Sequence, residues 1–356
     1  MDRELISSIL FSGVFDFAWW GYAAVALLLT HVTIAAVTIY LHRHQAHQAL
    51  DLHPAASHFF RLWLWLTTGM RTREWIAVHR KHHAKLETAD DPHSPQVLGI
   101  QRVLWGGVFL YVKEALNRQT LERYGHGAPD DWLERNVYSK YVLFGLTLMG
   151  VVDVILFGIV PGALILIAQI AWIPFWAAGV INGIGHYWGY RNWATEDAST
   201  NILPWGILIG GEELHNNHHA YVTSARLSNK WYEFDIGWMY IRLLEAAGLA
   251  RVRRVAPTPR LGAARPIADL RTLQAVIANR YDVLANFAGS LKRIGAREGK
   301  ALQKMHAMRL ELATLWERSM TSREHLLARL QDWCRRAEAS GIEPLVAFSQ
   351  RLRCYT

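Results

Sequence analysis

Two long apolar stretches restrict the folds open to this 356-residue chain. Residues 18–41 carry no charged side chain over 24 positions, and residues 141–182 supply about 42 almost continuously apolar positions. About 20 apolar residues are enough for a helix to cross a bilayer, so the first stretch predicts one span. The second stretch is long enough for two spans, joined by a tight turn where glycine and proline gather at residues 158–162. We therefore expect an all-α integral membrane helical bundle.

Histidine is concentrated in three short motifs, HRHQAH at 42–47, HRKHH at 79–83 and HNNHH at 215–219. Neutral imidazole is the commonest protein ligand for a transition metal, so this concentration predicts a metal site. The last two motifs share the spacing HxxHH. On a helix these offsets place three rings within roughly 100° of one face, so we expect the rings to converge on one point.

The first motif fits a helix less well than the other two. His42 and His47 are five residues apart, which is about 140° around an α-helix, whereas His44 and His47 are three apart and better aligned. Spacing alone therefore favours His44 over His42 as a metal ligand. A further candidate is His186, which follows Asn182 by four residues and ends the second apolar stretch.

These histidines can all lie on one side of a membrane. Between the first two motifs, residues 54–72 are too short and too charged to cross, so we interpret them as a re-entrant or interfacial helix. The two spans expected in residues 141–182 then return the chain to the same side. The positive-inside rule makes that side cytoplasmic, because five basic residues crowd the second motif: Arg71, Arg73, Arg80, Lys81 and Lys85. Residues 5–15 are either a partial span or an interfacial helix, which leaves the side of the N-terminus open.

The C-terminal part of the chain has a different composition. Residues 251–356 hold 20 Lys and Arg against 9 Asp and Glu, whereas the remainder holds 18 against 21. We expect a membrane domain over residues 1–250 and a soluble, basic helical region over 251–356, with amphipathic helices at 270–287, 301–318 and 322–339. The basic excess is either a solvated surface or an attraction for anionic lipid or an acidic electron-transfer protein. Nucleic-acid binding is not expected, since no recognised motif accompanies the charge.

The type of ligand narrows the metal chemistry. Cys334 and Cys354 are the two cysteines of the chain and lie far from the histidines in sequence, which disfavours iron–sulfur and structural zinc sites and fits a reducing compartment. About nine imidazole nitrogens are too many for one metal, so two metals are the economical interpretation. Iron suits an oxygen-activating role in a reducing compartment. A site at the end of apolar helices points to a lipid-like substrate.

The motifs resemble those of the membrane-bound fatty acyl desaturases, the family that includes stearoyl-CoA desaturase. The resemblance runs from about residue 37 to residue 238 and follows the family's order: HRHQAH at 42–47, EWIAVHRKHH at 74–83, DDPHSP at 90–95, NGIGHYWGYRN at 182–192, GEELHNNHHAY at 211–221 and WYEFDIGW at 231–238. The chain departs from the family on the N-terminal side, where members usually have two full spans and this chain has room for little more than one. It departs again at Glu213 and Leu214, where relatives commonly carry glycine and an aromatic residue.

The resemblance implies a centre of two iron ions (Fe2+/Fe3+) at the cytosolic ends of the membrane helices. Its implied ligands are nine histidines: His42, His47, His79, His82, His83, His186, His215, His218 and His219. His42 enters this set through the resemblance and against the spacing argument. Asn182 would approach one iron through a water molecule, and His44 would be an outer neighbour.

The implied activity is an oxygen-dependent fatty acid desaturase that leaves a cis double bond, expected at the delta-9 position, in a saturated acyl chain. O2 takes up four electrons, two from the substrate and two from an external donor. The sequence carries no flavin, haem or iron–sulfur motif, so the donor is expected to be a separate protein such as a ferredoxin with its reductase. The acyl carrier, coenzyme A or phospholipid, stays open. The expected location is a bacterial-type inner membrane.

Two other functions compete with this interpretation. A membrane di-iron alkane or lipid hydroxylase shares the metal class but adds oxygen to its substrate; the HRKHH and GEELHNNHH motifs favour the desaturase. A histidine-rich metal transporter or sensor would distribute polar or ionisable residues along the spans, whereas these histidines gather at the ends.

Further residues near the motifs are candidates for contacts with a ligand or the substrate. We expect Glu212 to hydrogen-bond a ligand, and Asp90, Asp91 and His93 either to form a turn or to contact a ligand or the substrate. Trp75 is suited to line an acyl tunnel or to anchor the chain at the interface. Arg73 is suited to bind an acyl carrier's phosphate, although positive-inside placement alone explains it. His31, inside the first span, is interpreted as a packing residue.

Overall fold

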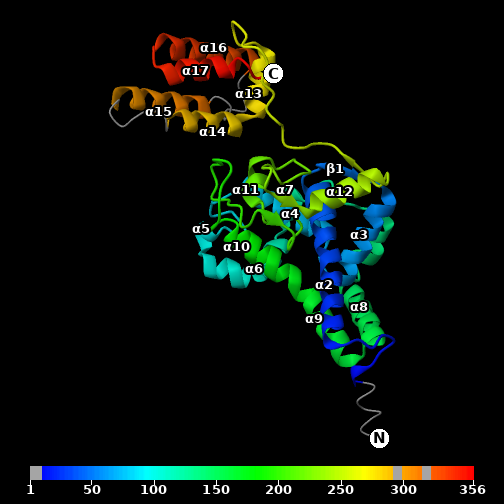
Figure 1. Ribbon diagram of the computed structural model, residues 1–356. Helices are drawn as coiled ribbons and strands as arrows, with labels where there is room; N and C mark the ends of the chain where they lie inside the picture. Colours follow the sequence, from blue (N-terminus) through cyan, green and yellow to red (C-terminus); the bar gives the residue numbers. More distant parts are fainter. Residues whose placement is uncertain (1–9, 292–298, 315–321) are drawn as a thin grey trace, which may run out of the picture. The chain divides into compact units, whose positions relative to one another are not determined.

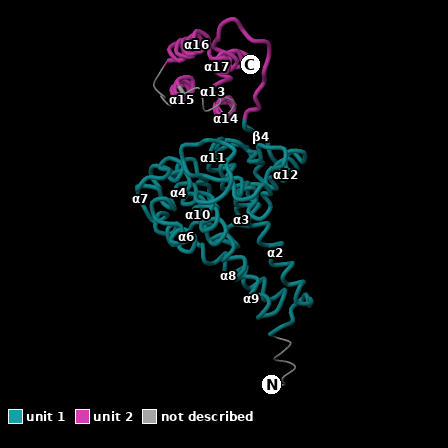
Figure 2. Tube along the Cα trace, turned by 60° about the vertical axis from the view of Figure 1, so that its left-hand side comes forward, with its two compact units in different colours: residues 1–256 teal, residues 257–356 magenta. Residues whose placement is uncertain are grey.

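The computed structural model describes residues 10–291, 299–314 and 322–356, and the chain forms two compact units, residues 1–256 and 257–356 (Figure 2). The strand β4 (Ala250–Val252) still belongs to the first unit, because it pairs antiparallel with β1 (Leu50–Leu52). The chain therefore leaves the first unit a few residues after the change in composition near residue 250.

Most of the regular secondary structure of the first unit is helical (Figure 1). Besides β1 and β4, its one other strand pair in the described residues is parallel, between β2 (Trp205–Gly206) and β3 (Phe234–Asp235). Its helices are α2 (Trp19–Ala36), η1 (Val37–Ala46), α3 (Pro54–Thr67), α4 (Thr72–Ala84), α5 (Pro95–Leu98), α6 (Ile100–Ala115), α7 (Arg118–Tyr124), η2 (Glu134–Tyr138), α8 (Val142–Phe157), α9 (Ile159–Ile173), η3 (Pro174–Ile181), α10 (Asn182–Ile184), α11 (His215–Ala220) and α12 (Ile236–Ala246).

The apolar stretches form α2, α8 and α9, which pack together at one end of the first unit (Figure 1). Two continuous helices in the described residues, Trp19–Ala46 and Ile159–Ile184, are long and apolar enough to cross a membrane. Helix α8 has 16 residues, so it is about 24 Å long and shorter than the roughly 30 Å hydrocarbon core. The second stretch thus contains one helix of spanning length and one shorter helix, instead of two full spans.

The turn between these helices depends on one glycine. Gly158 has φ +87° and separates α8 from α9. Pro161 does not form the turn as expected; it lies in the first turn of α9, where a missing backbone N–H breaks no helical hydrogen bond. Of residues 5–15, the first five lie outside the described residues; Leu10 and Phe11 are helical and the chain is irregular from there to Ala18.

Residues 54–72 do not form a single helix. Helix α3 ends at Thr67, and a short loop with Gly69 at φ +64° leads into α4. Arg61, the charge that argued against a crossing, is buried in α3 and hydrogen-bonds Asp131 and Glu134. A buried guanidinium is stable only when carboxylates satisfy it in this way.

Three described segments, η1, η2 and η3, adopt the wider π-helical winding, in which each N–H bonds the carbonyl five residues earlier. Two of them lead to the candidate site: η1 carries the first histidine motif, and η3 leads to Asn182. Pro174 begins η3, at a position where an α-helix would lose a hydrogen bond to its missing N–H. Both π-helical segments continue a long apolar helix toward the histidines.

The second unit is a bundle of α13 (Leu270–Ala278), α14 (Arg280–Leu291), α15 (Gly299–Thr314), α16 (Arg323–Ala339) and α17 (Glu343–Leu352). The single helix expected over residues 270–287 is wrong, because the chain breaks at Asn279 and continues as α14. The expected end of the next helix, residues 315–318, lies outside the described residues. Phe287, Trp333 and Phe348 pack edge to face in the core, so this unit has its own hydrophobic centre.

Candidate metal centre

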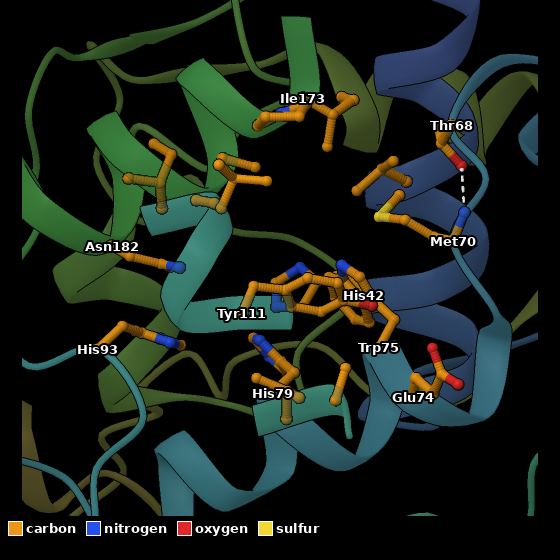
Figure 3. A pocket seen from close by; sticks show the side chains of 18 of the residues that line it. His42, Thr68, Met70, Glu74, Trp75, His79, His93, Tyr111, Ile173 and Asn182 are labelled. Carbon is orange, nitrogen blue, oxygen red and sulfur yellow. Dashed lines mark hydrogen bonds between the residues drawn. The ribbon is translucent and has the colours of Figure 1, made fainter. Parts of the chain in front are cut away.

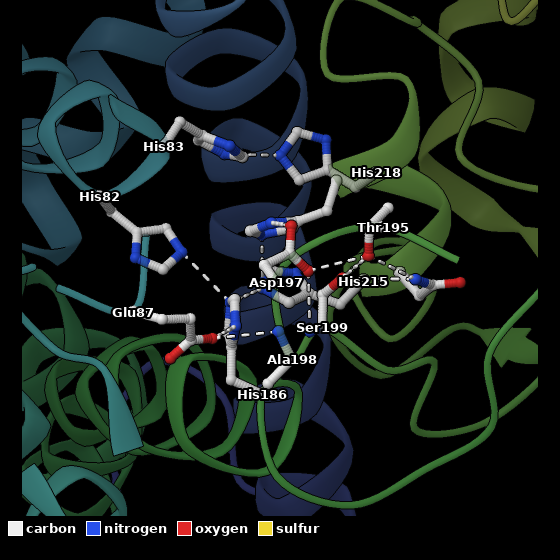
Figure 4. A network of polar contacts seen from close by, with 12 residues as sticks. His82, His83, Glu87, His186, Thr195, Asp197, Ala198, Ser199, His215 and His218 are labelled. Carbon is white, nitrogen blue, oxygen red and sulfur yellow. Dashed lines mark hydrogen bonds and ion pairs between the residues drawn. The ribbon is translucent and has the colours of Figure 1, made fainter. Parts of the chain in front are cut away.

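Four segments deliver the histidines to one region of the first unit. His42 and His47 come from the end of η1, and the second motif lies on α4. His186 follows α10, and the third motif makes up most of the six-residue helix α11. These segments are far apart in sequence, so only the tertiary fold brings their rings together (Figure 4).

The nine imidazoles expected from the resemblance divide into two groups in which the ligand atoms lie within 4.8 Å of one another. The first, which we call the five-histidine group, contains His42, His47, His79, His83 and His218. The second, the four-histidine group, contains His82, His186, His215 and His219. Within a group the Nε2 atoms face each other, as a shell of ligands around one cation requires.

Inter-ring distances describe the centre of each group. In the five-histidine group, Nε2 of His47 is 2.7 Å from that of His79, and Nε2 of His218 is 2.9 Å from that of His83. In the four-histidine group, His186 Nε2 is 3.2 Å from His82 Nε2 and 3.0 Å from His215 Nε2. Imidazole nitrogens this close share one small volume, which suits a single metal ion per group.

The two HxxHH motifs do not converge on one point, contrary to the expectation from their spacing. On α4, His79 and His83 belong to the five-histidine group and His82 to the other. On α11 the assignment is reversed, since His218 alone joins the five-histidine group. Side chains four apart project nearly together, whereas the one at the third position is turned by about 100° from the fourth. Each motif therefore divides between two sites.

The π-helical winding of η1 explains why His42, and not His44, enters the group. The backbone N–H of His47 donates to the carbonyl of His42 at 3.0 Å, so the two residues are one π-turn apart and share a face. His44 Nδ1 instead lies 2.9 Å from the carbonyl of Leu50. The spacing argument assumed an α-helix, and that assumption was wrong.

Carboxylates hold the outer nitrogen of four rings. The Nδ1 atoms of His42 and His82 lie 2.8 and 3.0 Å from Glu212 and Asp91. Those of His186 and His219 lie 3.1 and 3.2 Å from Glu87 and Asp197. A carboxylate at Nδ1 keeps that proton in place and leaves Nε2 free as a ligand, which raises metal affinity. This fits the short Nε2–Nε2 contact between His82 and His186, both of which have such a carboxylate.

Burial sets the protonation of the rings. Loss of hydration on burial lowers the pKa of seven histidines well below the ordinary value and keeps them neutral: His47, His79, His82, His83, His215, His218 and His219. Burial opposes ionisation of Glu87 too, but hydrogen bonds from His186 and Ser94 hold its pKa below the usual value. Burial raises the pKa of Asp91 to about 6. Neutral imidazoles are the form that binds a metal.

Of the other residues predicted near the site, the structure places some beside the histidines and others on the surface. Glu212 and Asp91 contact histidines of the groups, whereas Asp90 is exposed and pairs with Lys85 at 3.3 Å. Trp75 stacks on His79 with ring centroids 4.9 Å apart. Arg73 is exposed and does not line the cavity described below.

Several contacts were not predicted from the sequence. Glu87 and Asp197 lie in loops, where spacing gives no signal of contact with a histidine. His93, expected either in a turn or in contact with a ligand or the substrate, stacks on His82 with centroids 4.3 Å apart and forms a third metal-capable cluster with His82 and Asp91. Its Nε2 is buried without a hydrogen-bond partner among the described residues. His31, expected only to pack, lies 2.7 Å from the Tyr240 hydroxyl.

Rigid polar contacts hold the segments that carry the rings. Arg43 is almost fully buried and binds both oxygens of Asp235 at 2.9 and 3.0 Å. It also donates to the carbonyls of Gly210 and Ala225. Because Arg43 follows His42 directly, the bidentate pair fixes the end of η1 against β3, and the bond to Gly210 fixes it against the loop before α11.

A cavity of about 290 Å³ lies against both groups (Figure 3). Its polar wall includes His42 and His79 of one group and His215 of the other, together with His93 and Asn182. The rest of the lining is mostly apolar and comes from α2, η1, α4, α6 and η3. The cavity can therefore hold an apolar chain whose side faces the histidines.

Comparison with known proteins agrees with this arrangement. The family model for fatty acid desaturases matches residues 17–234. Delta-9 acyl-lipid desaturase 1 of Arabidopsis thaliana is 30% identical over 240 residues, which cover 66% of this chain and 76% of that protein. The sn-1 stearoyl-lipid 9-desaturase of Anabaena variabilis is 29% identical, covering 65% and 83%. The acyl-CoA C20 Delta5-desaturase of Anemone leveillei is 30% identical, covering 66% and 74%. The chain belongs to the fatty acid desaturase family and is an oxidoreductase that acts on fatty acyl chains with O2.

Proposed function

We propose that the protein introduces a cis double bond at the delta-9 position of a saturated acyl chain. The observation that carries this proposal is the apolar cavity whose wall contains His42, His79 and His215, drawn from both histidine groups. An acyl chain in this cavity lies beside both groups along its length. The cavity fixes which methylenes face the histidines, and a shift of one carbon changes the product.

Two iron ions are the proposed cofactors. The five-histidine group would hold one ion and the four-histidine group the other, with Asn182 approaching through a water molecule. Bound iron would supply the capacity to react with O2. The protein's own residues Glu212, Asp91, Glu87 and Asp197 orient four of the rings.

The electron balance requires a partner. O2 accepts four electrons and four protons to form two water molecules; the substrate supplies two of each as two C–H bonds break and a C=C bond forms. The other two electrons come from a donor protein, for which a ferredoxin with its reductase is the proposed candidate. The basic unit at residues 257–356 is suited to attract an acidic donor. Deleting residues 256–356 should then slow donor-dependent turnover at low salt; unchanged turnover would exclude this role.

The proposed location is a bacterial-type inner membrane with the histidines on the cytoplasmic side. Support comes from the two apolar helices of spanning length, both of which lead toward the histidines. The basic residues on and beside α4 support the orientation, since cytoplasmic loops are enriched in lysine and arginine.

Product analysis tests the function. The full chain is expressed in a host that lacks unsaturated fatty acids, and double bonds are located by mass spectrometry. We expect a delta-9 alkene and two irons per chain, with both lost in His218→Ala. A hydroxylated product without alkene would decide for the alkane or lipid hydroxylase, the competing function of the same metal class.

A further inference from the structure

The cavity beside the histidines has an opening at the end of α6. Most residues that line it are buried or half-buried, but Val112 and Leu116 are 48% and 76% exposed. The lining also includes Thr68, Gly69 and Met70 of the loop between α3 and α4, and Thr68 and Met70 lie across the cavity from Asn182 and His93 (Figure 3). Asn182 lies toward the other end of α6, because a Cβ at its neighbour Gly183 would be 3.4 Å from Ile100 Cδ1 and 3.5 Å from Leu104 Cα. The opening is therefore at the end away from Asn182.

The loop at this opening rests against the apolar hairpin. A side chain at Gly69 would meet Leu146 and Val142 of α8 at 3.1 and 3.3 Å. The adjoining residues of α8, Leu143 and Phe144, are exposed. Apolar surface thus continues from the first turns of α8 to the rim of the cavity.

Helix α6 separates the cavity from the exterior and is apolar on its outward face as well. Its inner face packs so closely on η3 that a Cβ at Gly107 would fall 2.1 Å from the Ala178 carbonyl oxygen. Its outer face exposes four apolar residues spaced four, three and four apart, a single helical stripe: Trp105, Phe109, Val112 and Leu116. A helix with such a stripe is suited to lie in a bilayer interface.

Two cations beside the rim are already paired with carboxylates. Glu74 is part of the lining and pairs with Arg71 at 2.8 Å. Lys81 pairs with Glu114 near the end of α6, also at 2.8 Å. Arg73 and Lys113, by contrast, are exposed and have no ion pair among the described residues. The charges therefore do not distinguish one acyl carrier from another, and the apolar surface of the rim decides the route.

We propose that acyl chains enter this cavity sideways from the bilayer, between the last two turns of α6 and residues 68–70, while still attached to a membrane glycerolipid. This inference rests on the proposed function and names its substrate class. The headgroup stays at the interface near the rim, and the chain follows the apolar surface past Leu116 into the cavity. A water-soluble thioester would have to cross the same apolar rim.

Photocrosslinking tests the route without turnover. Full-length wild-type protein in lipid nanodiscs, kept free of O2, is given phosphatidylglycerol with a diazirine in the middle of one acyl chain. A parallel sample receives the coenzyme A thioester of the same diazirine acid, and labelled residues are mapped by mass spectrometry. Labelling inside the cavity, at Ile173 or Ala177, is decisive because any bilayer lipid can label the rim. We expect the phospholipid to label these positions about tenfold more than the thioester.

A pair of variants tests the opening itself. Leu116→Glu places a carboxylate on the route and should lower phospholipid labelling inside the cavity about tenfold, since charge at a lipid-facing position is unfavourable. Leu310→Glu is the matched control, because Leu310 is 67% exposed on α15 of the second unit, and it should change nothing. Thermal unfolding should be the same for both variants, as neither leucine is buried.

Two outcomes overturn the inference. Cavity labelling by the thioester that equals or exceeds that by the phospholipid would show entry from water, and the proposed desaturation would stand. Cavity labelling that is unchanged in Leu116→Glu would move the entrance elsewhere. Absence of cavity labelling by either probe would overturn this inference together with the proposed function, because the cavity would not be the acyl site.

Discussion

Single carboxylates decide the direction of individual histidine rings. Each of Glu212, Asp91, Glu87 and Asp197 lies beside the Nδ1 atom of one ring and leaves its Nε2 pointing inward. Sequence motifs identified the rings and two of these four acids. The other two were not predictable from the sequence. Glu87 is 99 residues from its partner His186 and Asp197 is 22 residues from its partner His219, and only the paths of the intervening loops bring them together.

Asp90 and Asp91 are neighbours in sequence with opposite environments, which makes them a matched test. Asp91→Asn replaces the carboxylate 3.0 Å from His82 Nδ1. We expect its iron affinity to fall about 10- to 100-fold, the usual loss when a group that orients a metal-binding histidine is changed. The Asp90→Asn variant should bind iron as the wild type does, because the Asp90 side chain is exposed and contacts no histidine of either group. Iron stoichiometry after dialysis against a chelator is the measurement, and equal iron contents would count against a role for Asp91.

His42 and His44 offer a second matched pair. His42→Ala should lower the iron content of the purified protein, because His42 Nε2 lies 3.1 Å from His218 Nε2 inside the five-histidine group. His44→Ala should keep its iron, since its ring nitrogen bonds the carbonyl of Leu50 instead. Metal analysis and the spectrum of a nitric oxide adduct would detect the difference. A normal spectrum for His42→Ala would remove it from the ligand set.

At the scale of elements, helices and their order were predictable from apolar runs, but their winding was not. A search for apolar residues repeating every 3.6 positions cannot distinguish a π-helix from an α-helix in η1. The apolar run of η1 fits either winding. The break at Asn279 was missed for a related reason. Apolar residues at helical spacing continue across it, and a local pattern does not show that α13 ends at Asn279, its C-cap.

The hairpin of α8 and α9 contains a polar pair that the apolar pattern concealed. Asp153 and Gln169 are both fully buried, and Gln169 Nε2 donates to Asp153 Oδ2 at 2.9 Å. A charge at this position is costly, so Asp153→Asn, which keeps the shape and an acceptor, should leave the thermal midpoint unchanged or higher.

Asp153→Ala should instead lower stability by about 1–3 kcal/mol, because the Gln169 amide loses its partner inside an apolar hairpin. The double change to Asp153→Leu with Gln169→Leu should recover most of that loss. Thermal unfolding in detergent measures all three variants. A large loss of thermal stability in the Asp153→Asn variant would mean that the carboxylate is needed in its charged form.

At the scale of the molecule, the change in charge near residue 250 anticipated a second part of the chain, and the structure gives that part its own core. Trp333 is fully buried there, contacts Phe287 and Phe348, and donates its indole N–H to the Met308 carbonyl at 2.9 Å. Because the two units have separate cores, they should unfold separately.

Trp333→Ala tests this independence. We expect a loss of about 3–5 kcal/mol in the second unit, the usual result of removing a large buried aromatic side chain. Iron content should not change, since every histidine of the two groups lies in the first unit. Limited proteolysis and calorimetry report on each unit. Loss of iron in Trp333→Ala would show that the first unit depends on the second.

The reversed assignment of the two HxxHH motifs has a consequence for how the centre fills. Helices α4 and α11 each supply rings to both groups, so turning either helix disturbs both candidate metal positions at once. If each group holds one ion as proposed, the first ion would stiffen the scaffold of the other group and make binding of the second ion easier. Filling should then approach an all-or-none event, in which empty and doubly loaded chains coexist and half-loaded chains are scarce.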